Sequence, residues 1–386
     1  MNLIEFGTIS HIKKGKKPLR QTDKHQDGYM PYVDIEAFET GNVKMYTDGE
    51  KCLPCKVGDI LIVCDGSRSG FVGKAIDGYV GSTLAIISAD GMSQEYLYYF
   101  LQGKYALLNT KKKGTGTPHL DANILNQQKL VVPSLEEQKR VVARIEELFS
   151  ELDNGVETLK KTKLQLELYR QAVLKESFDF ADAPCSRLED LCFFITKGTT
   201  PSKSAMISGN GEIPFIKVYN LTFNNSLDFS IDPTFVNQDT HTGFLGRSVT
   251  YPGDVLMNIV GPPMGKVSIV PDTYPEWNIN QAIARFRCLD RLYNKYLAYF
   301  LGRSDTVEKM KSKAKATAGQ FNLTLEICRD IQIPVPPIEE QKKVVYNIET
   351  KLSQQQKISD TVDLALQQAE AMRQSILKKA FEGELI

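Results

Sequence analysis

The sequence predicts an α+β chain in which two mixed α/β domains are separated by two long helices that pair antiparallel as a coiled coil. The first observation is a stretch, Pro133–Val142, that recurs as Pro336–Val345 at an offset of 203 residues. A repeat of this length indicates a duplicated domain, because solenoid repeats run at about 20 to 50 residues. The second observation is a helical pattern after each copy, and the third is a series of short strand-like runs before each copy. Together they predict the order domain, helix, domain, helix.

Each recurring stretch has the residues of a helix start. In the first copy Pro133 ends a strand-like run, and Ser134 is suited to the N-cap. Glu136 and Glu137 then place negative charge in the first turn, where the helix dipole favours it. Apolar residues follow at spacings of four and three, which is the seam of a coiled coil. They are Ile145, Phe149, Leu152, Val156, Leu159, Leu166 and Val173.

Neither seam is continuous. Lys163 and Arg170 interrupt the first, and the second contains Gln355 and Ser359. We therefore expect each helix to need the other as its partner. The first helix enters the second domain and the second helix leaves it, so helices that pack along their length are antiparallel and relate the two halves by a pseudo-two-fold axis.

This arrangement has two geometric consequences. About 40 helical residues span roughly 60 Å, which separates the domains along a rod. The pairing also brings Phe178 near the start of the second helix, and Ile386 back toward the first domain. The predicted boundaries are 1–133 for the first domain, 134–182 for the first spacer helix, 183–336 for the second domain and 337–386 for the second spacer helix.

Composition excludes several classes of protein. The 386 residues open without a signal peptide and contain no run of about 18 apolar residues, so we expect a cytoplasmic protein without a membrane span. Seven scattered cysteines fit reduced thiols in that compartment. Cys52 and Cys55 have the spacing of half a zinc site, but no second pair completes four ligands, so we expect no metal. No glycine-rich cofactor loop is recognised, so we expect no cofactor.

The formal net charge is zero, with 47 basic and 47 acidic residues, which by itself argues mildly against a nucleic-acid binder. The charges are nevertheless sorted along the chain. Basic residues cluster at 11–24, 111–113 and 309–315, whereas acidic residues gather at the starts of the two helices. The globular domains therefore carry local basic clusters.

The two domains share a framework. Lys197-Gly198 in the second domain corresponds to Lys14-Gly15 in the first, and Gly253-Asp254 corresponds to Gly58-Asp59. Between these anchors the two halves differ almost completely, most of all at 220–246 and in the loops after the Gly-Asp pairs. One scaffold with two different faces is what recognition of two different targets requires.

With these features, the chain resembles the specificity subunit of type I restriction-modification systems. The resemblance rests on the two Glu-Gln-Lys helix starts (137–139 and 340–342), the Lys-Gly-Thr-Thr-Pro entry at 197–201 and the Gly-Asp strand starts, in the same order in both halves. It implies a non-enzymatic protein with two target recognition domains. Each domain reads one half of a split sequence in the major groove of double-stranded DNA, and the helices fix the gap. The implied partners are two modification (methyltransferase) subunits and a restriction (translocase-nuclease) subunit.

Side chains that read bases need paired donors and acceptors, whereas lysines on phosphate only set the register. The candidate phosphate contacts are Lys13, Lys14, Lys16, Lys17, Arg20, Lys112, Lys113, Thr115, Lys197, Lys203, Lys313, Lys315 and Thr317. The candidate base contacts are Ser67, Arg68, Ser69, Tyr219, Asn220, Arg247, Asn258, Asn280 and Gln281. A solvated face is the alternative explanation for any single lysine.

A partner surface is expected on the first helix. Leu164, Leu168 and Ala172 form a stripe at spacings of four beside the seam, which adds apolar surface beyond what one partner helix covers. We expect the modification subunits to dock there and to contribute helices of their own.

Three stretches have the outline of catalytic motifs and lack the chemistry. In Val260–Met264, glycine replaces the asparagine that would accept an amine hydrogen in an adenine methyltransferase, and methionine replaces the stacking tyrosine. In Gly66–Ala75, Arg68 stands where a phosphate loop needs its first glycine. Cys64 has no histidine nearby in sequence to activate it. We therefore expect no enzymatic activity in this chain.

Two alternatives remain open at this stage. One is a specificity subunit of another multi-subunit DNA-modifying assembly, such as a type IIB-like system, which differs only in its partners. The other is a coiled-coil scaffold whose end domains bind proteins and not DNA. A binding assay at two salt concentrations discriminates the second alternative, because affinity for DNA depends on salt through counterion release.

Overall fold

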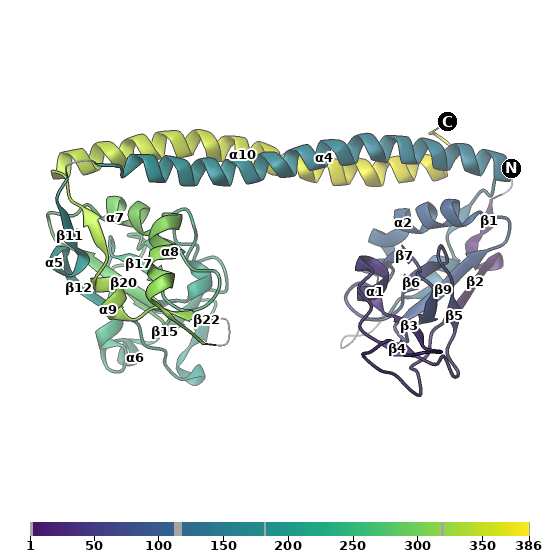
Figure 1. Ribbon diagram of the computed structural model, residues 1–386, viewed down its shortest axis with the longest axis horizontal. Coiled ribbons are helices and arrows are strands. Elements are labelled where there is room, and N and C mark those ends of the chain that lie inside the picture. The colour runs from purple at the N-terminus through teal and green to yellow at the C-terminus, as the bar shows by residue number, and fades with distance from the viewer. Residues whose placement is uncertain (1–2, 112–117, 181–182, 318–319, 386) are drawn as a thin grey trace. The chain divides into compact units, whose positions relative to one another are not determined.

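The computed structural model describes residues 3–111, 118–180, 183–317 and 320–385. The chain divides into two compact units, one formed by Met1–Lys160 with Asp363–Ile386 and the other by Lys161–Val362. Each unit therefore contains one globular domain together with part of each long helix, α4 (Leu135–Ser177) and α10 (Ile338–Glu382) (Figure 1). Within the described residues, no helix is both long enough and apolar enough to cross a membrane.

The first globular domain is built on two sheets. The four-stranded antiparallel sheet has the order β2 (Ser10–Lys14), β9 (Leu84–Ala89), β6 (Ile60–Val63), β7 (Val72–Lys74). The second sheet has the order β4 (Tyr46–Thr47), β3 (Met30–Val33), β8 (Gly78–Val80), β5 (Pro54–Cys55), and its β3–β8 pair is parallel. The remaining elements are β1 (Ile4–Glu5), η1 (Phe6–Thr8), α1 (Ile35–Thr40), α2 (Gln94–Thr110), α3 (Ala122–Asn126) and β10 (Lys129–Leu130).

Strand β6 explains how these layers pack. All four of its residues are buried, and because side chains alternate along a strand, they serve two cores. Ile60 and Ile62 face the core that contains Leu97 and Phe100 of α2, whereas Leu61 and Val63 face a second core beneath the other sheet. The strand-like runs that the sequence indicates before the first spacer helix are present as strands, and Leu108 is the buried residue at the end of α2.

The second globular domain repeats this plan. Its antiparallel sheet has the order β12 (Cys192–Lys197), β20 (Ile283–Cys288), β17 (Val255–Asn258), β18 (Val267–Ile269). Its second sheet has the order β13 (Ile207–Ser208), β15 (Thr234–Val236), β14 (Ile213–Ile216), β19 (Trp277–Ile279), β16 (Val249–Thr250), with β14 and β19 parallel. Strand β17 alternates between two cores as β6 does: Val255 and Met257 face one, and Leu256 faces the other.

Shorter elements complete the second domain. Around the sheets lie β11 (Cys185–Arg187), α5 (Leu188–Leu191), η2 (Lys203–Ala205), η3 (Val218–Asn220), α6 (Gln238–Thr242), η4 (Gly246–Ser248), α7 (Asn294–Leu301), α8 (Ser304–Lys313), β21 (Lys315–Thr317), β22 (Gln320–Asn322), α9 (Leu325–Arg329) and β23 (Gln332–Pro334). Helix α7 occupies the place that α2 holds in the first domain, so the duplication extends to the helical layer.

The recurring Glu-Gln-Lys motif locks each helix start onto its domain through a fully buried glutamine. The Nε2 atom of Gln138 donates to the carbonyls of Gly91 (2.7 Å) and Pro133 (2.9 Å), and its Oε1 accepts from the backbone N–H of Ser93 (2.8 Å), the N-cap of α2. Gln341 makes the same three bonds, to Arg291 and Pro336 and from Tyr293, the N-cap of α7. The motif occurs twice because the buried glutamine attaches the start of each long helix to its own globular domain; we call this attachment the joint.

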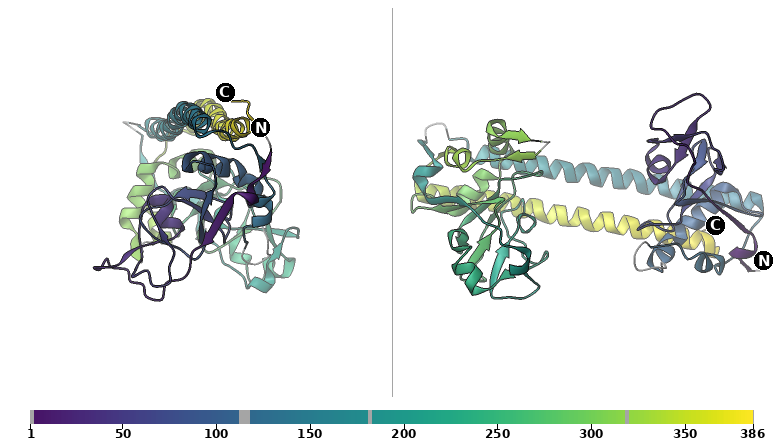
Figure 2. Two further views of the ribbon diagram at one scale, coloured as in Figure 1. Left: turned by 90° about the vertical axis from the view of Figure 1, so that its right-hand side faces the viewer. Right: turned by 90° about the horizontal axis from the view of Figure 1, so that it is seen from below.

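The predicted antiparallel pairing of the helices is confirmed within each unit. In the first unit, Ile145 and Phe149 of α4 pack with Leu377 and Ala380 of α10. Further along α4, Asp153 pairs with Arg373, so rising numbers on α4 meet falling numbers on α10. In the second unit, Val173 and Leu174 share a core with Val345, Ile348 and Leu352, and Glu176 lies 3.4 Å from Lys351. Figure 2 shows the two helices side by side in each unit.

The ends of the helices close onto the globular domains. Phe178 packs against Tyr296 and Phe300 of α7, with ring centroids 4.7 and 5.4 Å apart, in the core that also contains Val345 near the start of α10. The prediction for Phe178 is thus confirmed. Phe381 packs in the same way on Tyr96 and Phe100 of α2, at 5.0 and 5.4 Å, which returns the end of α10 to the first domain. Ile386 itself lies outside the described residues.

The charged interruptions of the seam have a structural role that the sequence did not reveal. The guanidinium of Arg170 donates to the backbone carbonyl of Phe223 at 2.7 Å, so Arg170 ties α4 to the second globular domain, and burial lowers its pKa. The equivalent Arg373 lies 4.2 Å above the ring of Phe149 and pairs with Asp153. These arginines stabilise the packing around the helices.

Candidate nucleic-acid interface

One end of the four-stranded sheet carries Lys14 and the basic residues next to it in sequence. Strands β2 and β6 both run antiparallel to β9, so their carboxyl ends lie at the same end of the sheet. Lys14 ends β2, and Asp65 follows β6; the Lys14 Nζ lies 2.8 Å from Asp65 Oδ2. A third segment arrives there, since His119 Nδ1 lies 2.7 Å from Asp65 Oδ1. We refer to this region, residues 13–20, 65–70 and 118–120, as the first sheet end.

The glycine of the Lys-Gly motif allows this convergence. A Cβ atom on Gly15 would lie 2.3 Å from the carbonyl oxygen of Gly81, which no side chain permits. Gly198 meets the same limit, with the carbonyl of Ile279 at 2.0 Å. Both glycines are therefore needed so that the chain can leave the edge strand close to the backbone of the second sheet.

The basic residues at the end of β2 and after it are accessible. Lys13, Lys16, Lys17 and Arg20 are exposed, and Arg20 forms ion pairs with Asp48 (3.1 Å) and Glu50 (3.5 Å). The pKa of Lys14 is raised, chiefly by its hydrogen bond to Asp65. Exposed cations on one sheet end can bind phosphates by exchanging these surface pairs, which are individually weak.

The predicted base readers in the loop after β6 differ in exposure. Ser67 is exposed, and its backbone carbonyl accepts a hydrogen bond from Asn109 at 3.0 Å. Arg68 is half-buried: it pairs with Glu39 and lies 4.4 Å above the ring of Phe71. Ser69 is fully buried, and its hydroxyl donates to the carbonyl of Gly66 at 2.7 Å. The prediction that Ser69 reads a base is corrected, because its hydroxyl closes the loop from inside.

The second domain forms an equivalent sheet end. Lys197 ends β12 and is exposed, and Val260 follows β17 in the place of Asp65. Val260 bridges Asn322 as Asp65 bridges His119, and both bridges are antiparallel. We refer to residues 197–203, 260–265 and 320–323 as the second sheet end. Lys203 in η2 and Lys313 at the end of α8 are exposed.

Several predicted contacts cannot be placed in full. Lys315 and Thr317 lie in β21, and their backbone alone is described. Lys112, Lys113 and Thr115 lie outside the described residues. These five remain predictions.

Two predicted base readers of the second domain are structural residues instead. Asn220 is 1% exposed, and its Nδ2 donates to the carbonyls of Asp228 (3.0 Å) and Ile231 (2.8 Å). Asn258 is fully buried, and its Nδ2 donates to the carbonyl of Pro263 at 2.8 Å. Buried amides must be bonded to backbone in this way, and these two hold loops in place. The predictions for Asn220 and Asn258 are therefore corrected.

The other predicted base readers are accessible. Arg247 in η4 and Gln281 after β19 are exposed. Asn280 is half-buried, and its Oδ1 accepts from the backbone N–H of Ala282 at 3.1 Å. These side chains retain polar atoms at the surface of the second domain.

Tyr219 belongs to a cluster that the sequence did not single out. Its hydroxyl donates to Asp232 Oδ2 at 2.6 Å, and Lys217 Nζ lies 3.4 Å from the same carboxylate and 5.4 Å from the Tyr219 ring. The hydrogen bond from Tyr219, together with the charge of Lys217, holds the pKa of Asp232 below its ordinary value. Asp232 also adopts a positive φ of 45°, which is uncommon for a residue other than glycine. Asp232 lies within the 220–246 stretch and Lys217 and Tyr219 directly precede it, so only folding brings Lys217 and Asp232 together.

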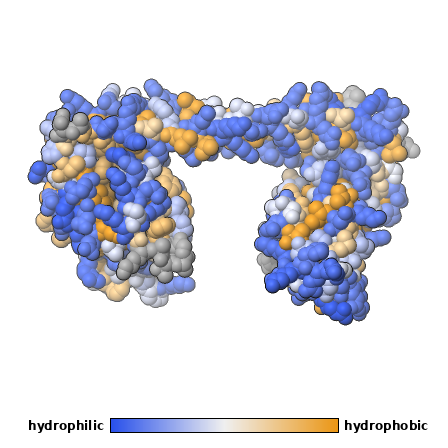
Figure 3. Space-filling view, viewed as in Figure 1, coloured by the Kyte–Doolittle hydropathy of each residue, from blue (hydrophilic) through white to orange (hydrophobic). Residues whose placement is uncertain are grey.

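The predicted partner stripe is exposed in the second unit. Leu164 and Leu168 are 58% and 63% exposed, and Ala172 is exposed beside them. Tyr169, at 46%, extends the apolar surface. Figure 3 shows apolar residues gathered on this helical part of the second unit among polar neighbours. An exposed apolar stripe rimmed by polar residues is typical of a protein contact.

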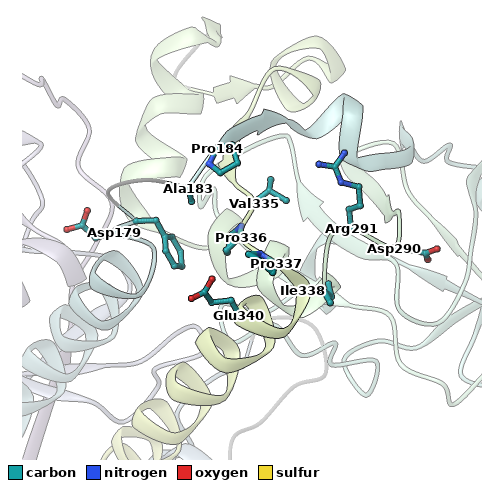
Figure 4. A pocket seen from close by; sticks show the side chains of 11 residues that line it. Asp179, Ala183, Pro184, Asp290, Arg291, Val335, Pro336, Pro337, Ile338 and Glu340 are labelled. Carbon is teal, nitrogen blue, oxygen red and sulfur yellow. The ribbon is translucent and has the colours of Figure 1, made fainter.

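A hollow in the second unit does not form a convergent small-molecule site. This hollow, of about 900 Å³, lies in the second unit beside the start of α10. Its charged side chains, Asp179, Asp290, Arg291 and Glu340, point in different directions and do not face a common point (Figure 4). A binding pocket needs a few polar groups that converge on the ligand.

The cysteines at 52 and 55 also lack the environment of metal ligands. Burial raises the pKa of Cys55 to about 12, whereas a metal ligand is a thiolate. Within the described ranges, no group of three histidine, cysteine or acidic side chains is arranged to hold a metal ion.

Comparisons with known proteins agree with this geometry. A family model described as type I restriction modification DNA specificity domain matches residues 1–168 and 184–364. The chain is 26% identical over 385 residues to the type I restriction enzyme MjaVIII specificity subunit of Methanocaldococcus jannaschii, which covers 90% of this chain and 85% of that protein. It is 23% identical over 415 residues to the EcoBI specificity subunit of Escherichia coli, with 99% and 85% covered.

A solved structure shares the fold. A chain from the work headed "Structural basis underlying complex assembly and conformational transition of the type I R-M system" matches with a TM-score of 0.71 at 21% identity, covering 99% of this chain and 98% of that chain. At 21% identity, this similarity shows a shared fold alone.

Proposed function

The chain belongs to the family of type I restriction modification DNA specificity domains, and from this premise we propose that it is the sequence-reading subunit of a type I restriction-modification complex. Each globular domain reads one half of a bipartite target in double-stranded DNA, and the paired helices set the gap. The observation that carries this proposal is the pair of sheet ends. The same scaffold presents exposed cations in both units, while the surrounding loops differ.

The division of labour follows from the chemistry of the exposed side chains. Lys13, Lys16 and Lys17 at the first sheet end, and Lys197 and Lys203 at the second, contact phosphates and position each domain on the duplex. Base edges are read by side chains from the loops that differ between the domains. In the second domain these are Tyr219, Arg247, Asn280 and Gln281. Arginine and amide side chains suit guanine and adenine edges in the major groove.

The catalytic steps belong to other subunits in this proposal. Two modification (methyltransferase) subunits dock on the helices, with the stripe of Leu164, Leu168 and Ala172 as one contact surface, and a restriction (translocase-nuclease) subunit completes the assembly. The chain itself supplies no catalytic group and holds no cofactor, and it acts in the cytoplasm. The functional domains are residues 1–133 and 183–336, joined by spacer helices at 134–182 and 337–386.

The experiment that tests the proposal is co-expression of the chain with its modification subunits, followed by mapping of methylated adenines in host DNA. A single bipartite motif with a fixed gap is the expected result. Affinity of the purified complex for that motif should fall steeply between 50 and 200 mM salt, as phosphate contacts require. An assembly that methylates no defined motif, or a chain whose partners are proteins alone, contradicts the proposal.

A further inference from the structure

Asp65 joins the side chains of a lysine and a histidine at the first sheet end. Its two carboxylate oxygens are each occupied, one by Lys14 Nζ at 2.8 Å and the other by His119 Nδ1 at 2.7 Å. The Asp65 side chain is 19% exposed, whereas those of Lys14 and His119 are 53% and 54% exposed. The carboxylate therefore lies beneath two accessible groups that it holds side by side.

The backbone of His119 is held in place by hydrogen bonds, as its ring is held by Asp65. Gly66 N–H donates to the carbonyl of Pro118, and Leu120 N–H donates to the carbonyl of Cys64, both at 2.8 Å. His119 is thus bridged to Asp65 through main chain on both sides. A side chain held in this way loses little further freedom when it meets a ligand, which favours specific recognition.

The hydrogen bond to Asp65 also sets which nitrogen of the ring is available. A carboxylate only accepts hydrogen bonds, so Nδ1 of His119 carries a proton and donates to Asp65. Nε2 makes no hydrogen bond to any side chain that the structure describes. In the neutral ring, Nε2 is an acceptor with a fixed position. Exocyclic amines of adenine and cytosine are the donors that the major groove presents to such an acceptor.

The second sheet end lacks this arrangement. Val260 stands in the place of Asp65 and cannot accept a hydrogen bond, and Asn322 stands in the place of His119. Lys197 is therefore free of the carboxylate that balances Lys14. Because Asp65 offsets the charge of Lys14, the cluster of the first domain is poorly suited to a phosphate and better suited to a base edge.

Resting on the proposed function, we propose that His119 is a base-reading residue of the first half-site, with Asp65 as its positioning residue. Nε2 of His119 accepts a hydrogen bond from an exocyclic base amine, and Asp65 fixes the ring by its bond to Nδ1. Lys14, bound to the other oxygen, keeps Asp65 ionised and in place; the pKa of Asp65 is held down by its bonds to Lys14 and His119 against the opposing effect of burial.

The test uses the whole chain in complex with its modification subunits. His119→Asn and Asp65→Val introduce the residues that the second sheet end already carries, and Asn322→His is the matched control in the other domain. Binding is measured to the mapped motif and to duplexes in which each base pair is changed singly. A thermal unfolding curve of each variant confirms that it is folded.

We expect both first-domain variants to lose discrimination about ten- to hundredfold at one base pair of one half-site, with the other half unchanged. His119→Gln has a longer side chain than His119→Asn and can carry its amide oxygen to the position of Nε2, so it should recover part of that loss, whereas Asn322→His should leave that base pair as it was. The inference is overturned if His119→Asn discriminates like the parent. It is also overturned if binding weakens equally for all sequences and the salt slope falls by about one, since that result identifies a phosphate contact. A parent complex that shows no sequence preference contradicts the proposed function instead.

Discussion

Replacing the buried glutamine of the second helix start, Gln341→Leu, tests the joint between helix and domain. The substitution removes three hydrogen bonds of 2.8 to 2.9 Å and leaves the N–H of Tyr293 and the carbonyl of Pro336 without their partner. Each neutral hydrogen bond contributes about 1 kcal/mol, and an unsatisfied buried group costs about 1–3 kcal/mol. Water can reach the exposed Arg291, so we expect the second unit to lose about 2–3 kcal/mol of unfolding free energy.

The assay uses the only tryptophan of the chain, Trp277, which is 1% exposed in the second unit. Its fluorescence follows urea unfolding of that unit, and a loss of this size moves the midpoint down by about 1 M at ordinary denaturant slopes. Gln354→Leu, at an exposed position of the same helix, is the matched control and should change stability by less than about 0.5 kcal/mol. If Gln341→Leu behaves like that control, the buried glutamine is not the joint and the reasoning fails.

Three further outcomes are expected. Leu164→Glu combined with Leu168→Glu should leave the chain folded and abolish co-purification of the modification subunits; an intact assembly would show that partners dock elsewhere. Lys16→Ala should weaken binding to all DNA sequences and lower the salt slope by about one, whereas a change in base preference would contradict a phosphate contact. Gly198→Ala, whose Cβ meets a carbonyl at 2.0 Å, should destabilise the second unit, whereas Gly246→Ala, which meets nothing within 4 Å, should not; equal effects would refute the close-approach argument.

The duplication made the architecture accessible from sequence. Two copies of one helix start, separated by strand-like runs, were enough to predict both domains and the antiparallel pairing, because connectivity leaves few ways to pack two such helices. The role of Arg170 was not predictable, because periodicity marks it as an interruption of the seam and does not show that its side chain can reach the carbonyl of Phe223 in the globular domain.

The candidate interface was predictable only in outline. Clusters of lysines were recognised because exposure is the ordinary state of a lysine. Polar residues were not separable in this way, since an asparagine that reads a base and one that holds a loop look alike in sequence; burial and bonding to backbone distinguish Asn220 and Asn258 from Gln281. His119 was missed because its partner Asp65 is 54 residues away in sequence.

The most direct test of the central claim is a methylation map after two exchanges in the assembled complex. Replacing loops 220–246 and 261–277, together with the flanking base readers Tyr219, Arg247, Asn280 and Gln281, with the residues of another family member should change one half of the methylated motif and leave the other half unaltered. Inserting four residues into α4 between Gly155 and Phe178 should widen the gap by about 6 Å, close to two base pairs, with both halves unchanged. Loop exchange that altered both halves together, or an insertion that changed base preference at a constant gap, would contradict the account.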